Sequence, residues 1–406
     1  MQKKFRAVFC QNDLRPAYYD DFHCLMAGCR LNCCTGGWHI AFGKKDYLTI
    51  KKQRGSAELN AGLDHCLCRI RENVDEQYRY GEFVLQDGCC PLLREGKCGL
   101  QMEKGAKVLP FVCRTFPRTE TPMPSGYLER TLTPACEGVL ALLWELPEGV
   151  EFRSDPLPPE EQRVFTFEED SSTLLPHFQE IRELCVDILQ DRRRPLPERM
   201  LLLGMVLRPL AEGERDIPAW LERSRAIEDS GGSAGLLRED LLPMFLVHNA
   251  NTVLSISGGD QFFCETQRDL RAALGLPEHS AGRGRIQPEP YLKARERFDR
   301  QFGNKEFFFE NLMVSVFFHM RMPDLKSSEA LWKSYVNFCN LYSAYRFLSV
   351  MSCREGVTDC RAELFRLLVL SSRALIHNRE RQNAFRDGLF ENDSATLAHM
   401  AILLSG

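Results

Sequence analysis

Beyond about residue 160, the apolar residues recur at intervals of three and four, which is the spacing of amphipathic helices. The pattern is interrupted at prolines and at Gly231-Gly232, where helices are expected to end. No strands alternate with these stretches, so a doubly wound sheet is not predicted. We therefore expect an all-α helical-bundle domain over residues 160–406, with helices over residues 168–192, 198–212, 216–229, 236–256, 259–274, 290–320, 328–352, 358–379 and 381–404.

The first part of the chain has a different pattern, in which short strands, turns and loops predominate. Residues 79–88 alternate apolar and polar side chains and end in an Asp-Gly turn signal, which predicts a strand. Residues 46–73 predict one or two short amphipathic helices, and residues 147–160 form a proline-rich, acidic connector. The predicted fold is mainly α, with a small cysteine-rich α+β metal-binding domain over residues 1–147 followed by the all-α domain.

Composition and charge exclude several classes of protein. The chain has 406 residues, of which 44% are hydrophobic and 27% charged, as in an ordinary globular protein. A net charge of −4 argues against a nucleic-acid partner. No apolar run approaches the ~20 residues that cross a bilayer, because Glu310 and Asn311 interrupt the longest one, so no membrane span is expected. The N-terminal residues lack the apolar segment of a signal peptide, which predicts a cytoplasmic location, and the oligomeric state is left open.

Cysteine is the residue whose distribution is unusual. Twelve of the 17 cysteines lie in residues 1–136. A chain of this length buries enough surface to fold without disulfides, and in a reducing compartment clustered cysteines bind metal or perform redox chemistry. Adjacent thiols rarely supply two good ligands, so each of the pairs Cys33-Cys34 and Cys89-Cys90 is expected to give one. The candidate metal ligands are Cys29, Cys33, Cys34, Cys90, Cys98 and Cys113.

The metal is not specified by this spacing. Thiolates suit both iron–sulfur clusters and zinc, so either is compatible with the six candidates. The alternative interpretation is that several of these cysteines are small buried apolar residues, and we prefer it for Cys10, Cys66, Cys68, Cys89 and the five cysteines after residue 136.

Several longer motifs resemble those of a known family. They are PAYYDDFHC, CCTGGW, YGEFVL, CRTFPR and LERTLTPAC in the first part of the chain, and FFFENLMVSVFF and SSRALIHN in the second. Together they resemble the bacterial flagellin lysine-N-methylase family, and the cysteine-rich part is similar to the broader zinc- or iron-chelating cysteine-cluster domain. The chain departs from the family pattern at Leu92, Phe116 and Glu137, which weakens Cys136 as a ligand relative to Cys113.

The resemblance implies an activity and two cofactors. It implies transfer of methyl groups from S-adenosylmethionine to lysine side chains of flagellin, and a [4Fe–4S] cluster held by the cysteines, with zinc as the alternative. The methyl-donor site is not visible in the sequence, because no glycine-rich turn follows a strand. The Cys-x3-Cys-x2-Cys signature of radical chemistry is also interrupted, since its third position is Gly36.

Methylation of lysine requires the neutral amine, which is only about one molecule in 10³ near neutral pH. Acidic residues within the family-like motifs are candidates to lower this barrier, and the predicted catalytic residues are Asp20, Asp21 and Glu310. Trp38 and Arg114 are predicted to contact the methyl donor, through cation–π attraction and its carboxylate respectively.

Each of these roles has a structural alternative. The two aspartates are alternatively exposed residues of a turn, and Trp38 is alternatively a residue that anchors the core. Arg114 alternatively forms an ion pair with a neighbouring acid. Glu310 suits a hydrogen-bonding lock between helices, and for His377 a structural role is preferred. For the whole chain, the alternatives to an enzyme are a non-enzymatic iron- or zinc-binding protein-interaction module and a redox protein that uses adjacent dithiols.

Overall fold

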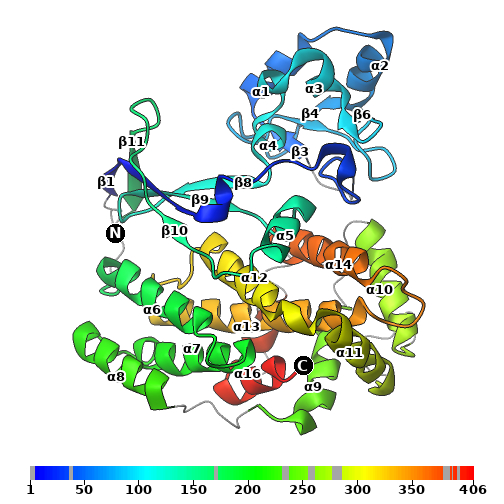
Figure 1. The fold of residues 1–406 in the computed structure, drawn as a ribbon. Helices are drawn as coiled ribbons and strands as arrows, with labels where there is room; N and C mark the ends of the chain where they lie inside the picture. Colours follow the sequence, from blue (N-terminus) through cyan, green and yellow to red (C-terminus); the bar gives the residue numbers. More distant parts are fainter. Residues whose placement is uncertain are drawn as a thin grey trace.

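The structure is a computed structural model, and it describes residues 5–35, 40–168, 172–230, 237–254, 261–276, 286–377, 385, 387–390 and 394–406. A cysteine-rich lobe lies at one end and a large helical lobe at the other, with a thin layer of strands between them (Figure 1). Two separate groups of buried side chains form the main cores of these lobes.

The helical lobe is built around one long central helix. Helix α13 (Ser328–Met351) is buried along most of its length, and it packs against α7, α9, α11, α14 and α16. A helix that is apolar on all sides belongs in the interior of a large lobe. The helices around it are α6 (Phe178–Gln190), α7 (Leu196–Ala211), α8 (Ile217–Ser230), α9 (Leu242–Thr252), α10 (Gln261–Ala273), α11 (Glu289–Phe302), α12 (Glu306–His319), α14 (Cys360–Leu375) and α16 (Leu397–Leu404).

Side-chain caps fix the start of two important helices. The Ser327 hydroxyl accepts the backbone N–H of Ala330 at 3.0 Å at the start of α13, and the Asp359 carboxylate accepts that of Ala362 at 2.9 Å at the start of α14. Such caps satisfy N–H groups that the helix itself leaves unpaired. The helices agree with most of the predicted ranges, but three ranges differ. The first helix begins at Phe178 and not at residue 168, and the short 3-10 turn Gly303–Lys305 separates α11 from α12 within residues 290–320. Over residues 381–404, the non-helical residues 394–396 precede α16.

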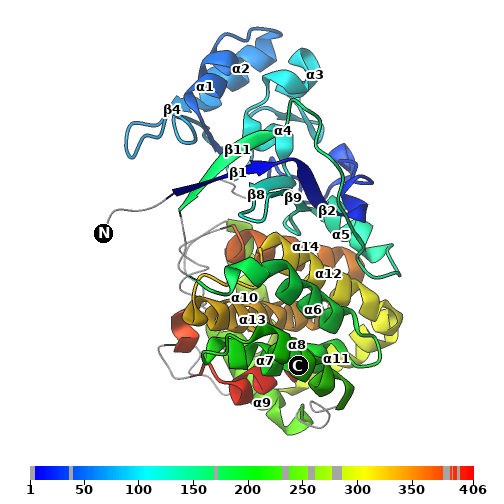
Figure 2. The same ribbon diagram turned by 90° about the vertical axis from the view of Figure 1, so that its left-hand side faces the viewer.

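The strand layer joins both ends of the first 170 residues. One sheet has the order β10-β2-β9-β8, formed by Phe152–Arg153, Asn12–Pro16, Tyr127–Leu132 and Arg118–Pro122. A two-stranded ribbon pairs β1 (Phe5–Cys10) with β11 (Arg163–Glu168), and it projects beside the sheet (Figure 2). Helix α5 (Glu137–Trp144) follows this layer and packs against α12 and α14. The strand layer and α5 thus place residues 127–136 directly over the helices.

The cysteine-rich lobe has a small core of its own. Its sheet has the order β3-β5-β4, formed by Ile40–Phe42, Gly81–Phe83 and Leu67–Arg69, and a hairpin pairs β6 (Leu93–Arg94) with β7 (Lys97–Cys98). The helices are α1 (Lys44–Lys51), α2 (Ala57–Cys66), α3 (Gly99–Lys104) and α4 (Phe111–Thr115). The strand predicted before Asp87-Gly88 is confirmed as β5, and both turn residues have a positive φ.

The mainly α character predicted from the sequence is confirmed, whereas the division at residues 147–160 stays a prediction. The strand layer belongs with the helices, because Tyr18, Phe22, Met123 and Leu132 pack into the large core. Among the helices of the described ranges, none combines the length and the apolar surface needed to cross a membrane.

Candidate functional site

Five of the six predicted metal ligands converge in the cysteine-rich lobe. The thiols of Cys33 and Cys34 are hydrogen-bonded to each other, and Cys34 lies within electrostatic range of Cys90 and Cys98. Cys113, on α4, interacts in the same way with Cys33, Cys90 and Cys98. The backbone ties two of the segments together, since the N–H of Cys90 donates to the carbonyl of Cys34 at 2.8 Å. We call these five residues the thiol cluster.

Burial dominates the electrostatics of the thiol cluster. It raises the pKa of Cys90 to about 11 and that of Cys113 well above its usual value, because a thiolate is poorly solvated there. Cys33 is the exception, since the hydrogen bond from Cys34 lowers the pKa of Cys33 to about 7 and outweighs the effect of burial. Cys33 is therefore the thiol most ready to become a thiolate ligand.

Cys29 lies apart from the thiol cluster. Burial is the main cause of its raised pKa, followed by the charge of Glu137, and Cys24 and Cys136 are its thiol neighbours. Glu137 begins α5, and its Oε2 atom accepts the backbone N–H groups of Arg30 at 2.8 Å and Leu31 at 3.1 Å. The structure therefore places Cys29 in a second group of thiols at the N-terminus of α5.

A resident cluster fits the chemistry of these donors. Within the part of the chain that the structure describes, no group of three or more His, Cys, Asp or Glu side chains is arranged to hold a single metal ion. Thiolates of a four-iron cluster each bind a different iron, so they stand further apart than the ligands of a single ion. The thiol cluster brings five thiols from four separate segments, enough for the four ligands of such a cluster, and Cys66 at the end of α2 is a further thiol near Cys90 and Cys98.

Arg373 connects the thiol cluster to the helical lobe. Its guanidinium lies near the C-terminal end of α14 and donates to the carbonyls of Thr35 at 3.0 Å, Leu31 at 3.0 Å and Asn32 at 3.2 Å. These carbonyls flank Cys33 and Cys34 on both sides. Arg373 is almost fully buried, and its charge also helps to lower the pKa of Cys33. It is thus a positioning residue for the loop that carries two of the five thiols.

Replacing Arg373 tests this connection. We expect Arg373→Gln to lose about 2–4 kcal/mol of stability, because a buried charged donor of three hydrogen bonds is removed, and to lower the iron content of protein purified without oxygen. Arg361→Gln is the matched control, since Arg361 is on the same helix and pairs with Glu145 at the surface. Equal iron content and equal urea midpoints for both variants would contradict the positioning role.

Two histidines meet where the helices contact the strand layer. His319 is the last residue of α12 and His377 follows α14, and their ring centroids are 5.9 Å apart. Threonines of the segment over residues 127–133 hold both rings: Thr131 Oγ1 lies 2.7 Å from His319 Nδ1, and Thr133 Oγ1 lies 2.6 Å from His377 Nε2. We call His319 and His377 the histidine pair.

The surroundings keep the histidine pair neutral. Burial lowers the pKa of His319 to about 3, aided by the charges of His377 and Arg321, and lowers that of His377 to about 4, aided by Arg373. His319 is half-buried, and His377 keeps part of its surface exposed although neighbouring groups surround its ring closely enough to lower its pKa. Both imidazoles are therefore neutral in the physiological pH range, so each ring has one donor and one acceptor nitrogen.

The predicted catalytic aspartates lie at the surface of the strand layer. Asp20 pairs with Arg15, whose NH2 atom is 3.0 Å away, and Asp21 is exposed. The neighbouring tyrosines face inward: Tyr18 is fully enclosed and its hydroxyl lies 2.5 Å from Ser315 Oγ, while Arg118 stacks 5.4 Å from the ring of Tyr19. The structure brings neither aspartate to the histidine pair or to the thiol cluster through a contact, and their catalytic role stays a prediction.

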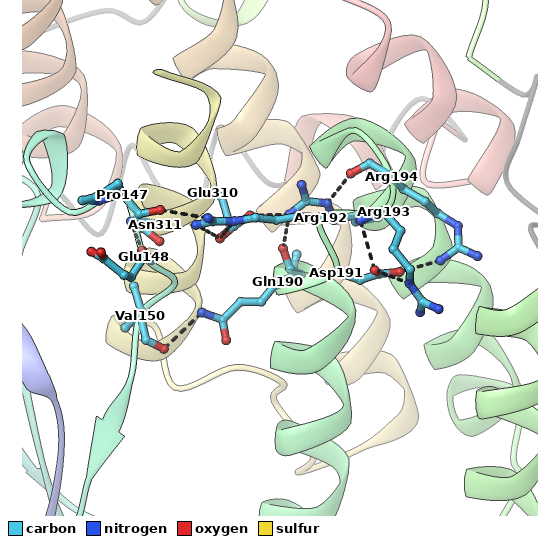
Figure 3. A network of polar contacts seen from close by, with 12 residues as sticks. Pro147, Glu148, Val150, Gln190, Asp191, Arg192, Arg193, Arg194, Glu310 and Asn311 are labelled. Atoms are coloured by element: carbon cyan, nitrogen blue, oxygen red, sulfur yellow. Dashed lines mark hydrogen bonds and ion pairs between the residues drawn. The ribbon is translucent and has the colours of Figure 1, made fainter. Parts of the chain in front are cut away.

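Glu310 lies in a buried network between α12, the start of the connector and the end of α6 (Figure 3). Its carboxylate accepts hydrogen bonds from Arg192 Nε at 3.0 Å and NH2 at 2.8 Å, and from Arg199 NH1 at 2.6 Å. Asn311 donates beside it to the carbonyls of Leu146 at 2.7 Å and Glu148 at 3.0 Å. These hydrogen bonds join α12 to the connector, to the end of α6 and to α7, which is the interhelical lock considered as the structural role of Glu310. A catalytic role for Glu310 stays a prediction.

Of the two residues predicted to contact the methyl donor, only Arg114 lies within the described residues. Arg114 is exposed on α4, and its guanidinium donates to the carbonyl of Leu109 at 2.9 Å. It adjoins Cys113, so it lies at the edge of the thiol cluster. Trp38 lies outside the described residues, and both roles stay predictions.

Comparison with known families identifies the family to which the chain belongs. A model of the family described as the FliB lysine N-methylase C-terminal domain matches residues 182–403, more than half of the chain. The chain belongs to the FliB lysine N-methylase family. This confirms the resemblance found in the sequence. No curated protein and no solved structure matches the chain. The region that matches this lysine N-methylase family contains the histidine pair, Arg373 and Glu310, whereas the thiol cluster precedes it.

Sequence reasoning did not single out His319, and it preferred a structural role for His377, which stays a prediction. The residues of this region do belong to three of the family-like motifs. LERTLTPAC contains Thr131 and Thr133, and SSRALIHN contains Arg373 and His377. His319 directly follows FFFENLMVSVFF. The motifs are far apart along the chain, so only the fold reveals that they meet.

Proposed function

We propose that this protein transfers methyl groups from S-adenosylmethionine to lysine side chains of flagellin. The observation that carries the proposal is the family match over residues 182–403, together with the meeting of the family-like motifs around the histidine pair and the thiol cluster. A protein substrate agrees with the family's description as lysine N-methylases. A cytoplasmic location, where flagellin is made and thiols stay reduced, is part of the same proposal.

A [4Fe–4S] cluster is the second part of the proposal. Cys33, Cys34, Cys90, Cys98 and Cys113 are the residues that would hold it, with Cys33 and Cys34 competing for one position because they are adjacent. When bound, such a cluster supplies a redox-capable iron–sulfur centre and cross-links the segments that carry its ligands. The chain's own contribution is to hold these segments against α14 through Arg373.

Co-expression tests the activity. Flagellin produced together with this protein is expected to gain mass in steps of about 14 daltons, one for each methyl group, and peptide mapping is expected to place them on lysines. Flagellin produced with an empty vector is the control. Unmodified flagellin in the presence of soluble, iron-loaded protein would contradict the proposal and favour a non-enzymatic metal-binding module.

A further inference from the structure

We propose that Arg94 sets the reduction potential of the iron–sulfur cluster, because its guanidinium donates a hydrogen bond to the sulfur of Cys98 and favours the reduced form. The inference rests on the proposed function, of which the cluster is a part, and deepens it by assigning a residue that regulates the same site. The group that Arg94 recognises is a thiolate-bound iron–sulfur centre, whose negative charge grows when it is reduced.

The hairpin of β6 and β7 places Arg94 next to Cys98. Arg94 pairs with Lys97 across the two strands, and Cys98 is the residue that follows. The N–H of Gly99 donates to the carbonyl of Leu92 at 2.7 Å, which continues the pairing past Cys98. The backbone therefore fixes the position of Cys98 relative to the strand that carries Arg94.

The guanidinium of Arg94 lies directly on the backbone of Gly99. A Cβ atom on Gly99 would lie 2.8 Å from Arg94 Nε and 3.0 Å from its Cζ atom, closer than the packing of side chains allows. Glycine permits this approach because it has no side chain. Cys98 thus lies between Lys97, the strand partner of Arg94, and Gly99, which the guanidinium contacts.

Two carboxylates hold the guanidinium and leave one of its nitrogens without an acceptor. Arg94 NH1 lies 2.8 Å from Glu103 Oε1, and Arg94 Nε lies 3.2 Å from Glu58 Oε1. Hydrogen bonds from Ser56, and then from Arg94, lower the pKa of Glu103 to about 2, so this anchor stays ionised. Arg94 NH2 is buried and has no hydrogen-bond partner among the described residues. Because an unpaired buried donor is costly, we expect it to face a group that the cluster site supplies.

The electrostatics show that Arg94 acts on Cys98. Burial raises the pKa of the Cys98 thiol, while the backbone N–H groups of Gln101 and Leu100 and the charge of Arg94 act in the opposite direction. Arg94 therefore stabilises negative charge on this sulfur. A thiolate that binds iron carries such charge, so the guanidinium is suited to be its hydrogen-bond donor.

An N–H donor beside a ligand sulfur changes the reduction potential of a cluster. Reduction adds one electron, and no bond forms or breaks, so the thiolates and sulfides become more negative. A charged donor stabilises the reduced form more than the oxidised form, and hydrogen bonds to sulfur are among the factors that set the potential of iron–sulfur clusters. Arg94 is therefore expected to raise the potential.

The experiment measures the midpoint potential of the iron-loaded protein by titration with dithionite, followed by electron paramagnetic resonance. For Arg94→Gln we expect a more negative potential, by about tenfold in the ratio of oxidised to reduced cluster, which is about 59 mV for one electron. Arg94→Lys keeps the charge but not the planar fork of donors, so its shift should be smaller. Arg54→Gln is the control, since Arg54 is exposed in the same lobe and lies 4.0 Å from Asp64, and it should keep the wild-type potential.

Gly99→Ala tests the contact without removing the arginine. Gly99 does not have a positive φ, so alanine is compatible with its backbone, but the new Cβ atom displaces the guanidinium of Arg94. We expect the potential of Gly99→Ala to shift in the same direction as that of Arg94→Gln. If Arg94→Gln loses its iron, Arg94→Lys and Gly99→Ala decide the outcome.

The potential separates this role from a structural one. An arginine that only joins the hairpin to α2 and α3 would change the urea midpoint and leave the potential of the cluster unchanged. Wild-type potentials in the Arg94 and Gly99 variants, at equal iron content, would therefore overturn the inference while leaving the proposed function intact. A wild-type protein that contains no iron and sulfide would overturn the cluster proposal and this inference with it.

Discussion

Protein carrying Cys113→Ala is expected to be purified without iron or acid-labile sulfide, and to methylate no flagellin. Cys113 is the thiol that brings α4 to the thiol cluster, and it lies within electrostatic range of Cys33, Cys90 and Cys98. In the proposed cluster, loss of one thiolate leaves an iron without its protein ligand, and even weaker changes around a metal site lower its affinity about 10- to 100-fold. Because cluster binding and folding are coupled, the cysteine-rich lobe should also unfold at a lower temperature.

Cys68→Ala is the control for this prediction. Cys68 lies in the same lobe on β4, is exposed, and has no place in the thiol cluster. Both variants are purified without oxygen and assayed for iron, sulfide and zinc. Wild-type iron content in Cys113→Ala would show that this residue is not a ligand, and zinc in place of iron and sulfide in the wild type would contradict the iron–sulfur proposal.

Glu310→Ala is expected to lose about 3–5 kcal/mol of stability, the cost of leaving buried charges without their partner. Arg199 and Glu310 are both almost fully buried, and the carboxylate is the acceptor that joins Arg199 to Arg192. Without it, the connector at Pro147 loses its tie to the end of α6, since Arg192 also donates to the Pro147 carbonyl at 2.8 Å. Urea unfolding followed by circular dichroism measures the change.

A surface carboxylate on another helix controls for the loss of a charge. Glu329 pairs with Lys333 one turn away on α13 and is exposed, so Glu329→Ala should leave the urea midpoint at the wild-type value. The same variants distinguish the two roles considered for Glu310. An unchanged midpoint with lost methylation would establish catalysis, whereas a lowered midpoint supports the lock.

Most helices of the helical lobe could be predicted because their apolar spacing and their flanking prolines lie within the local sequence. The apolar spacing and the proline breaks anticipated α6 to α14. The spacing failed at residues 303–305 because the buried face of the amphipathic α11, which ends with Phe298 and Phe302, runs directly into the apolar α12, and no proline separates the two helices. The strand layer was harder to foresee. β2 pairs with β9 in parallel across more than a hundred residues, and no local pattern specifies such a pairing.

The sequence predicted which cysteines come together only in part, and their role as metal ligands stays a prediction. Cysteine spacing selected five residues that do converge, but it also selected Cys29, which Glu137 and the start of α5 hold elsewhere. Buried polar residues behave differently, since their partners come from distant segments. Glu310 binds Arg192, which follows α6, and Arg199 of α7, and the sequence connected neither arginine to it. His319 and His377 come together because α12 and α14 end beside the same segment, residues 127–133.

The most direct test of the central claim is methylation of flagellin by the purified, iron-loaded protein with S-adenosylmethionine labelled in its methyl group. The account predicts that the label appears on flagellin lysines, that the donor becomes its thioether in equal amount, and that the Cys113→Ala protein transfers little or none. Flagellin that gains no label while the donor stays intact, with the iron–sulfur cluster present, would contradict the account.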